Sequence, residues 1–206
     1  MYIAVIDYNM GNISSVSNAF KRIGADVRVT SSAAVIRNAG ALVLPGVGAF
    51  RDAYSNLKKL KLIDVLEKDI PKKNFLGICL GMQLLFEYSM ENGKNSGMGI
   101  LSGSVEKIPS IVKVPHMGWN QLKILKKNSK ILKGIREGEN FYFVHSYYVM
   151  PENKDIISSV TDYGIEITAC IEQDNIYGIQ FHPEKSSTIG LMILENFWNL
   201  AKEESR

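Results

Sequence analysis

The sequence predicts an α/β protein built on a doubly wound, mostly parallel open sheet, with helices on both faces and an antiparallel extension in the second half. Two observations predict this fold. Apolar strand-like segments alternate with helical ones in the first half of the chain, whereas the second half holds successive strand-like segments. No linker, internal repeat or low-complexity tract interrupts the 206 residues, so we expect a single domain over 1–206.

The first half is expected to alternate between strand and helix. Ile13, Val16 and Phe20 recur at helical spacing after an apolar N-terminal strand. The segment at 26–30 alternates between apolar and polar residues, as a half-buried or edge strand does. In chain order the expected elements are a strand at 2–7, a helix at 13–23 with a stop at Gly24, strands at 26–30 and 41–46, helices at about 49–59 and 61–70, a central strand at 75–79, and a helix from Leu80 to about Tyr88.

The second half is expected to consist mainly of strands, some of them antiparallel, followed by one long helix. The strands are expected near 103–108, 121–125, 141–149, 156–161, 165–172 and 175–181, and the helix at about 189–203. This helix is identified by residues at helical spacing, which are Ile189, Met192, Ile193, Asn196, Phe197 and Leu200. We expect it to cover the sheet.

Composition and charge exclude several classes of protein. Apolar residues make up 46% of the chain and charged residues 22%, the balance of a folded globular protein rather than a disordered one. The net charge is +3, and the densest basic stretch, at 122–130, is interpreted as a solvated edge rather than a nucleic-acid patch. No apolar run approaches the roughly 18 residues of a membrane helix, and the N-terminal run is too short for a signal sequence. We therefore expect a cytoplasmic protein that binds neither nucleic acid nor membrane.

The two cysteines of the chain lie in different contexts. Cys79 and Cys170 are far apart in the sequence, which predicts neither a disulfide framework nor a metal site. Cys170 lies within a strand pattern and is expected in the core. Cys79 lies between Gly77 and Gly81, where a strand gives way to a helix, and this is the pattern of a nucleophile elbow. The alternative for Cys79 is a small buried thiol without a catalytic role.

The elbow pattern has a specific chemical meaning. Its glycines permit a tight turn that a Cβ atom would obstruct, and a helix N-terminus favours thiolate over thiol. The backbone N–H of Leu80 would point toward the group that the sulfur attacks and could bind an oxyanion. Ligands of open parallel sheets bind at the carboxyl ends of the strands, so Cys79 is expected at a ligand site.

A cysteine nucleophile needs an acid–base partner and a group that orients this partner. His182 ends an apolar strand and is followed by Pro183 and Glu184. Proline favours an extended His182, so the imidazole and the Glu184 carboxylate are expected on the same side, where the carboxylate steadies the ring. His116 lacks a nearby carboxylate and His145 ends an aromatic-rich strand, so these two are expected to be structural or to line a pocket.

The segment PGVGAF at 45–50 directly follows another strand. Its two glycines allow backbone N–H groups to approach a ligand closely. Many strand-to-helix turns contain glycine and proline, so the segment gains its significance from lying on the same rim of the sheet as Cys79.

Taken together, these residues resemble the class I (triad) glutamine amidotransferases, and more closely the glutaminase subunits of imidazole glycerol phosphate synthase. The resemblance covers essentially the whole chain, in the family's order, through DYNMGN, LPGVGAF, LGICLGMQLLFE, VPHMGWN, YFVHSYY and GIQFHPEKS. The cysteine and His-Pro-Glu motifs are typical of the whole superfamily, whereas PGVGAF and PHMGWN point to this branch. The resemblance implies a flavodoxin-like fold with neither cofactor nor metal.

The resemblance also implies a role for each matching residue. Cys79 attacks the side-chain amide of L-glutamine and forms a glutamyl thioester. His182, held by Glu184, protonates the departing ammonia and then activates water. The implied oxyanion hole consists of Leu80, Val47 and Gly48, and the implied glutamine-binding residues are Gly46, Gly48, Gln83, His145, Ser146 and Tyr147.

A partner subunit is implied as well, because ammonia must reach a second active site before it is lost. It is a HisF-type (β/α)8-barrel cyclase subunit, and the heterodimer makes imidazole glycerol phosphate and an aminoimidazole carboxamide ribotide (AICAR) in histidine biosynthesis. The implied contact residues are Asn12, Met117, Trp119, Asn120 and Lys185. For Trp119 a place in the core stays open, because an indole is often simply buried.

Three alternatives stay open from the residues alone. A related glutaminase subunit could supply ammonia to an amidinating enzyme of bacterial surface-sugar synthesis, since the triad would be the same. A non-catalytic regulatory or binding domain could share the fold, although the intact Cys79, His182 and Glu184 weigh against it. A cysteine protease or another thiol hydrolase could use a similar elbow.

Overall fold

The computed structural model describes residues 1–203, which contain an eight-stranded sheet in the order β2-β1-β3-β4-β14-β13-β12-β9. The strands that run parallel are β1 (Ile3–Ile6), β2 (Val27–Thr30), β3 (Ala41–Gly46), β4 (Asn74–Cys79) and β14 (Ile176–Ile179). The sheet continues antiparallel through β13 (Glu166–Gln173), β12 (Ile157–Asp162) and β9 (Lys123–Ile124). The predicted mostly parallel sheet with an antiparallel extension is confirmed, and β2 is an edge strand as expected.

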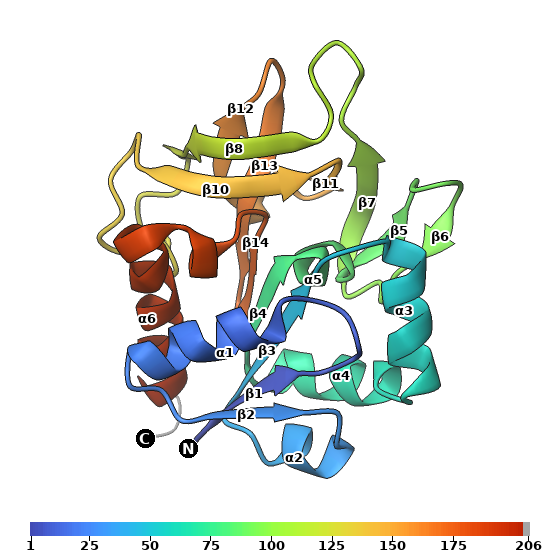
Figure 1. The fold of residues 1–206 in the computed structure, drawn as a ribbon, viewed down its shortest axis with the longest axis vertical. Helices are drawn as coiled ribbons and strands as arrows, with labels where there is room; N and C mark the ends of the chain where they lie inside the picture. The colour runs from blue at the N-terminus through green and yellow to red at the C-terminus, as the bar shows by residue number, and fades with distance from the viewer. Residues whose placement is uncertain (204–206) are drawn as a thin grey trace.

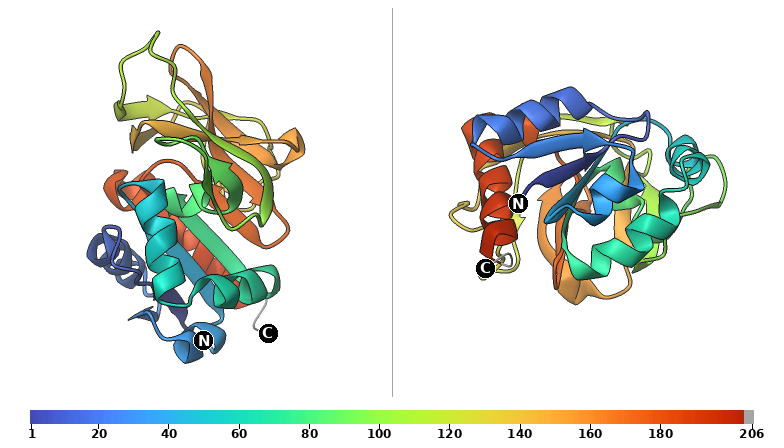
Figure 2. Two further views of the ribbon diagram at one scale, coloured as in Figure 1. Left: turned by 90° about the vertical axis from the view of Figure 1, so that its right-hand side faces the viewer. Right: turned by 90° about the horizontal axis from the view of Figure 1, so that it is seen from below.

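Helices cover both faces of the parallel part, as Figure 2 shows in the view from below. One face carries α1 (Ile13–Arg22) and α6 (Ser187–Glu203), and the other carries α2 (Ala33–Arg37), α3 (Phe50–Lys59) and α4 (Ile63–Asp69). Side chains along β1 alternate between the two faces: Ile3 and Val5 belong to the apolar cluster under α1 and α6, whereas Ala4 and Ile6 belong to the other cluster. Both faces of the sheet are therefore buried, which confirms the doubly wound prediction.

Two smaller sheets lie over the end of the parallel strands where α5 (Leu80–Gln83) begins (Figure 1). One is an antiparallel ribbon of β8 (His116–Gln121) and β10 (Asn140–His145). The other consists, in order, of β11 (Tyr147–Pro151), β7 (Leu101–Lys107), β5 (Phe86–Ser89) and β6 (Asn95–Ser96). Three short 3₁₀ turns complete the described elements: η1 (Ile70–Lys72), η2 (Lys154–Ile156) and η3 (Pro183–Lys185).

The predicted helix from Leu80 to Tyr88 is wrong beyond Gln83. The chain turns at Leu84 and Leu85, and Phe86 begins β5, which pairs with β7. Leu84, Leu85 and Phe86 are fully buried, as the sequence suggested. A short apolar run fits a buried strand as well as a buried helix, and long-range pairing decides between them.

Two strand predictions in the second half also need correction. The strand expected at 141–149 is two strands that pair with different partners, β10 with β8 and β11 with β7. The strand expected at 121–125 is interrupted after Gln121, and the sequence analysis missed the half-exposed strand β8 and the five-residue α2. These elements are short or half polar, so they carry little periodic signal. The final helix begins at Ser187, and Met192 is 37% exposed rather than buried against the sheet.

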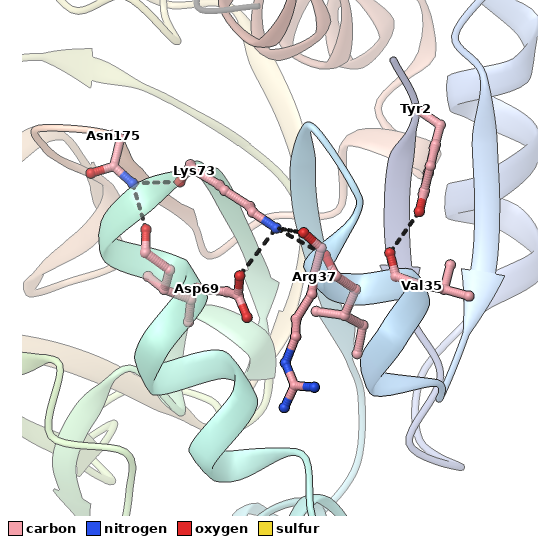
Figure 3. Close-up of polar contacts among 8 residues, drawn as sticks. Tyr2, Val35, Arg37, Asp69, Lys73 and Asn175 are labelled. Atoms are coloured by element: carbon pink, nitrogen blue, oxygen red, sulfur yellow. Dashed lines mark hydrogen bonds and ion pairs between the residues drawn. The ribbon is translucent and has the colours of Figure 1, made fainter.

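A polar cluster ties the amino ends of the parallel strands together (Figure 3). The Lys73 ammonium donates to the carbonyls of Ile36 and Arg37 and pairs with Asp69 at 3.1 Å. The side-chain amide of Asn175 donates to the Lys73 carbonyl. This cluster links α2, α4 and the turn before β14 at the end of the sheet opposite α5. No helix within residues 1–203 is long and apolar enough to span a membrane.

Candidate active site

The order of the sheet brings three strand ends together. Gly46, the last residue of β3, is the register partner of Cys79 at the end of β4. On the other side of β4, Ile78 is paired with Ile179 of β14, and His182 follows three residues later. The glycine loop, the cysteine and the histidine thus meet at one rim of the sheet, as the sequence predicted.

The elbow around Cys79 is as tight as its glycines suggested. Cys79 has a left-handed backbone with φ +53°, which is uncommon for a residue with a side chain. A Cβ atom on Gly81 would lie 1.7 Å from the Leu44 carbonyl oxygen, and one on Gly77 would lie 2.8 Å from the Gly81 carbonyl carbon. The glycines are needed for close backbone approach, while the strained backbone is that of the cysteine itself.

The helix after the cysteine is shorter than expected. Because α5 has only four residues, it supplies oriented N–H groups but little macrodipole at Cys79. Leu80 is its first residue, whose N–H has no acceptor within the helix.

His182 and Glu184 lie together. His182 Nδ1 is 2.9 Å from Glu184 Oε1, and the two side chains are only 2% and 1% exposed. His182 has an extended backbone (φ −100°, ψ 99°), and the 3₁₀ turn η3 brings Glu184 back to the ring. The proximity is as predicted, although a turn rather than a fully extended segment produces it. The other ring nitrogen, Nε2, is buried.

The electrostatic setting of His182 favours its charged form. Burial by itself lowers the pKa of the imidazole, but hydrogen bonding and charge attraction from Cys79 and Glu184 raise that pKa to about 10. The ring therefore keeps a proton beside the sulfur at neutral pH, which is the form that can protonate a leaving amine.

A cavity of about 360 Å³ opens over Cys79. Its lining residues are Val47, Gly48, Cys79, Leu80, Gln83, Glu91, Pro115, Val144, His145, Ser146 and Tyr147. All predicted oxyanion residues and all predicted glutamine-binding residues except Gly46 line this cavity, and Gly46 ends the strand beside Cys79. Within residues 1–203, no group of three or more His, Cys, Asp and Glu is placed to hold a metal ion.

Two glutamine side chains form a buried amide relay to the cysteine. The side-chain nitrogen of Gln83 donates to the Tyr147 carbonyl at 2.9 Å and to Gln180 Oε1 at 3.1 Å. The Gln180 nitrogen in turn lies 3.4 Å from the Cys79 sulfur. The sequence analysis missed Gln180, although it stands two residues before His182 on the same strand end and so projects to the same side.

Glu91 and Tyr8 are two further site residues that no sequence pattern indicated. Glu91 lines the cavity, and its Oε2 accepts the backbone N–H of Phe50 at 2.6 Å, so it holds the start of α3 behind the glycine loop. Tyr8 is fully buried; burial and the nearby Cys79 raise the pKa of its phenol. Its hydroxyl lies 2.4 Å from the place of a Cβ on Gly46. Glu91 lies in a turn, where the sequence offers no periodic signal.

The glycine loop at Gly46–Gly48 packs against the segment that follows β1. Gly48 has φ +106°, and a Cβ there would also meet the Met10 methyl at 2.8 Å. A side chain at Gly48 would therefore strain the backbone and displace Met10. The segments DYNMGN and PGVGAF belong to one structural unit.

Three of the predicted partner-contact residues, Met117, Trp119 and Asn120, lie on β8, and Lys185 lies beside β10, the strand paired with β8. Met117 and Trp119 are 63% and 55% exposed, so the core alternative for Trp119 is wrong. Lys185 is exposed, with its ammonium 5.7 Å from the Tyr142 ring, which also contacts the Trp119 ring. The Asn120 side chain points inward, donating to the Asp162 carbonyl at 2.8 Å. Asn12 is the residue before α1, away from β8 in the sequence.

Comparison with known proteins agrees with this geometry. Residues 4–200 match the family model of the glutamine amidotransferases of class I. The chain is 53% identical over 201 residues to the "Imidazole glycerol phosphate synthase subunit HisH" of Caldanaerobacter subterraneus, covering 97% of this chain and 98% of the relative. It is 52% identical over 205 residues to the protein of the same name from Aquifex aeolicus, covering 98% and 99%.

Solved structures share the fold at lower sequence similarity. The crystal structure of a glutamine amidotransferase has a TM-score of 0.77 at 16% identity, covering 98% of this chain and all of that chain. A PurLQS structure from Thermotoga maritima has a TM-score of 0.75 at 16% identity, covering 97% and 98%. At this identity the likeness concerns the architecture alone.

Proposed function

Because the chain belongs to the HisH family of class I glutamine amidotransferases, we propose that it acts as a single cytoplasmic glutaminase domain that passes ammonia to a HisF-type (β/α)8-barrel cyclase subunit. Membership of this family assigns the chain to glutamine hydrolysis in histidine biosynthesis. The named relatives are subunits of imidazole glycerol phosphate synthase, which favours this pathway over surface-sugar amidination. One observation carries the assignment of the catalytic residues: a strained Cys79 shares a strand rim with a buried His182 that Glu184 orients.

The proposed reaction begins with attack of the Cys79 sulfur on the side-chain carbonyl carbon of L-glutamine. The oxyanion would be held by the N–H of Leu80 and by N–H groups of the loop that contains Val47 and Gly48. His182 gives its proton to the amide nitrogen, the C–N bond breaks, and ammonia leaves a glutamyl thioester. His182 then takes a proton from water, which attacks the thioester and releases glutamate and the thiol.

The cavity also offers groups that suit a free amino acid. Among residues 1–203, Glu91 is the only acidic residue in its lining, so we propose that its carboxylate binds the α-ammonium of glutamine. Both N–H groups of the Gln83 amide are already used by Tyr147 and Gln180, which leaves the Gln83 oxygen to accept a hydrogen bond from substrate.

Replacing Glu91 by glutamine is expected to raise KM for glutamine by about 10-fold or more, because a charge-assisted hydrogen bond contributes about 1.5–3 kcal/mol. The value of kcat should change less, since the amide oxygen of the new side chain can still accept the Phe50 N–H. Steady-state hydrolysis in the presence of the partner measures both. Glu87 is the matched control: it also accepts a backbone N–H, from Gly103 at 2.9 Å, but does not line the cavity. Equal KM values in Glu91→Gln and Glu87→Gln would contradict the role of Glu91.

Exposed apolar side chains support docking of the barrel subunit on β8. Met117 and Trp119 are large and solvent-exposed, and Lys185 lies beside the Tyr142 ring that Trp119 contacts. Methionine and tryptophan are enriched in protein–protein interfaces relative to the rest of the protein surface. We propose that this face, together with Asn12 and the β8 strand that holds Asn120, receives the partner.

Glutaminase assays with and without the barrel test the proposed function. We expect little hydrolysis by the chain alone, and about 100-fold stimulation when a HisF-type barrel and its phosphoribulosyl-formimino-carboxamide nucleotide are both present. The formation of glutamate is measured by its coupled enzymatic oxidation. An equal rate in the three states, chain alone, with barrel, and with barrel and nucleotide, would refute the partner while leaving the glutaminase chemistry in place.

A further inference from the structure

Three side chains form a continuous line between strand β8 and the cavity. The Asn120 amide nitrogen lies 3.2 Å from His116 Nε2, and His116 Nδ1 lies 3.0 Å from His145 Nε2. His145 Nδ1 lies 2.9 Å from the Tyr147 carbonyl oxygen. His116 and His145 are opposite each other in the β8–β10 ribbon and are 2% and 6% exposed. Neither histidine belongs to the proposed triad.

The acceptors at the two ends fix the direction of this line. A carbonyl oxygen only accepts, so His145 carries its proton on Nδ1 and presents a lone pair at Nε2. His116 must then donate from Nδ1, which leaves its Nε2 to accept from Asn120. The Asn120 amide is oriented independently, because its nitrogen donates to the Asp162 carbonyl and its oxygen accepts the Gln121 N–H. Every donor along the line therefore points toward Tyr147.

The rings are held in this arrangement by packing. His116 is stacked between Phe143, at 4.8 Å between ring centroids, and Tyr163, at 4.0 Å. Burial lowers the pKa of His116 to about 4 and that of His145 to about 3, so both rings are neutral at physiological pH. Neutral rings are required, because a charged ring would place two donors against each other.

The line continues to the nucleophile through the Tyr147 carbonyl. This oxygen accepts both His145 Nδ1–H and the Gln83 amide, so its two lone pairs are occupied by two neighbours that line the cavity. Gln83 in turn holds Gln180, whose amide reaches the Cys79 sulfur. Loss of the His116 donor would leave the His145 ring without a hydrogen bond at Nε2. The ring could then move, and the Tyr147 carbonyl, which also accepts the Gln83 amide, would lose one of the two donors that hold it in place.

We propose that His116 is a positioning residue for glutamine hydrolysis: its Nδ1–H holds His145, and through the Tyr147 carbonyl it sets the place of Gln83 in the cavity. The same line connects the cavity to Asn120 on the strand that is proposed to face the partner. This inference rests on the proposed function and adds to it a residue outside the cavity lining.

The protonation of the two rings is the first test. Long-range ¹H–¹⁵N spectra of the full chain labelled with ¹⁵N-histidine report which ring nitrogen carries the proton. We expect His116 and His145 to be neutral, with the proton on Nδ1 in both. A proton on Nε2 of either ring, or a charged ring at neutral pH, would overturn the inference whether or not any variant folds.

A matched pair of variants tests the effect on turnover. His116→Phe keeps a ring between Phe143 and Tyr163 but removes the donor, whereas His116→Asn keeps an N–H at the position of Nδ1. In the complex with the partner, we expect His116→Phe to lower kcat/KM for glutamine by about 10-fold or more, mainly through KM, because misplaced binding groups are costly. His116→Asn should recover most of this loss.

The comparison separates positioning from packing. Equal kcat/KM values in the two variants, whether both resemble wild type or both are impaired, would overturn the role of the Nδ1–H. Thermal unfolding of both variants checks that neither is merely unfolded. If the wild-type complex hydrolyses no glutamine, the proposed function fails and the positioning role fails with it. If the wild-type complex is active but the two variants have the same kcat/KM, only the positioning role is overturned.

Discussion

Replacing Cys79 by alanine is expected to lower glutamine hydrolysis in the complex with the partner by about 10⁴-fold or more, because removal of a catalytic nucleophile leaves only binding and oxyanion stabilisation. The substitution removes one buried sulfur and adds no volume, so the fold should be retained. Coupled glutamate oxidation measures the rate, and far-UV circular dichroism checks the fold. Hydrolysis at the wild-type rate would refute the proposed mechanism.

Two controls make the Cys79 result specific. Cys170 is the other free cysteine, fully buried in β13, and burial raises the pKa of its thiol to about 12. Cys170→Ala should lose some stability through a small cavity but keep its glutaminase rate. If the partner is the proposed barrel subunit, the complex that contains Cys79→Ala should still form product when ammonium salt is added, because that subunit would consume ammonia directly.

Replacing Gly81 by alanine is expected to destabilise the protein by about 3 kcal/mol or more, because the new methyl group cannot be placed without moving backbone. It would lie 1.7 Å from the Leu44 carbonyl oxygen in the centre of the buried strand β3. The elbow, including Cys79, would have to move away from β3. We therefore expect the rate of glutamine hydrolysis to fall together with the free energy of unfolding. Urea unfolding followed by fluorescence measures the change in the free energy of unfolding.

Gly40 provides the matched control for this substitution. The three atoms nearest to a Cβ atom there all belong to the side chain of Met1, with Cγ at 2.2 Å, and a flexible side chain can move aside. Gly40→Ala should therefore change the free energy of unfolding by less than about 1 kcal/mol. If Gly81→Ala were as stable as Gly40→Ala, the close packing of the elbow against β3 would be refuted.

Much of the active site could be predicted because its chemistry is carried by local patterns. Cys79 between two glycines at a strand end, and His182 two residues before Glu184, are recognisable within a few residues of sequence. The parallel part of the sheet was equally accessible, since strands such as β3 and β4 are apolar along their whole length. Local sequence is enough where one short segment forms both the backbone geometry and the reactive group.

Other parts of the site are assembled from distant segments and could not be predicted in this way. Glu91 reaches the cavity because the chain turns after Gln83 and continues as β5, where a longer helix was expected. The contact between His116 and His145 exists because β8 pairs with β10, and neither residue has a local motif that announces the other. Trp119 is exposed for the same reason: it lies on the outer side of that ribbon.

The sequence by itself determined the proposed nucleophile, its proposed acid–base partner, the glycine loop and the parallel sheet whose rim carries them, because each depends on residues close together in the chain. Only the tertiary structure decided how long the elbow helix is, which acid faces the substrate cavity, and how His116 is joined to Cys79 through His145, Tyr147, Gln83 and Gln180. These features depend on strand pairing and on hydrogen bonds between residues far apart in sequence, and buried polar groups must find those partners because leaving them unpaired is costly.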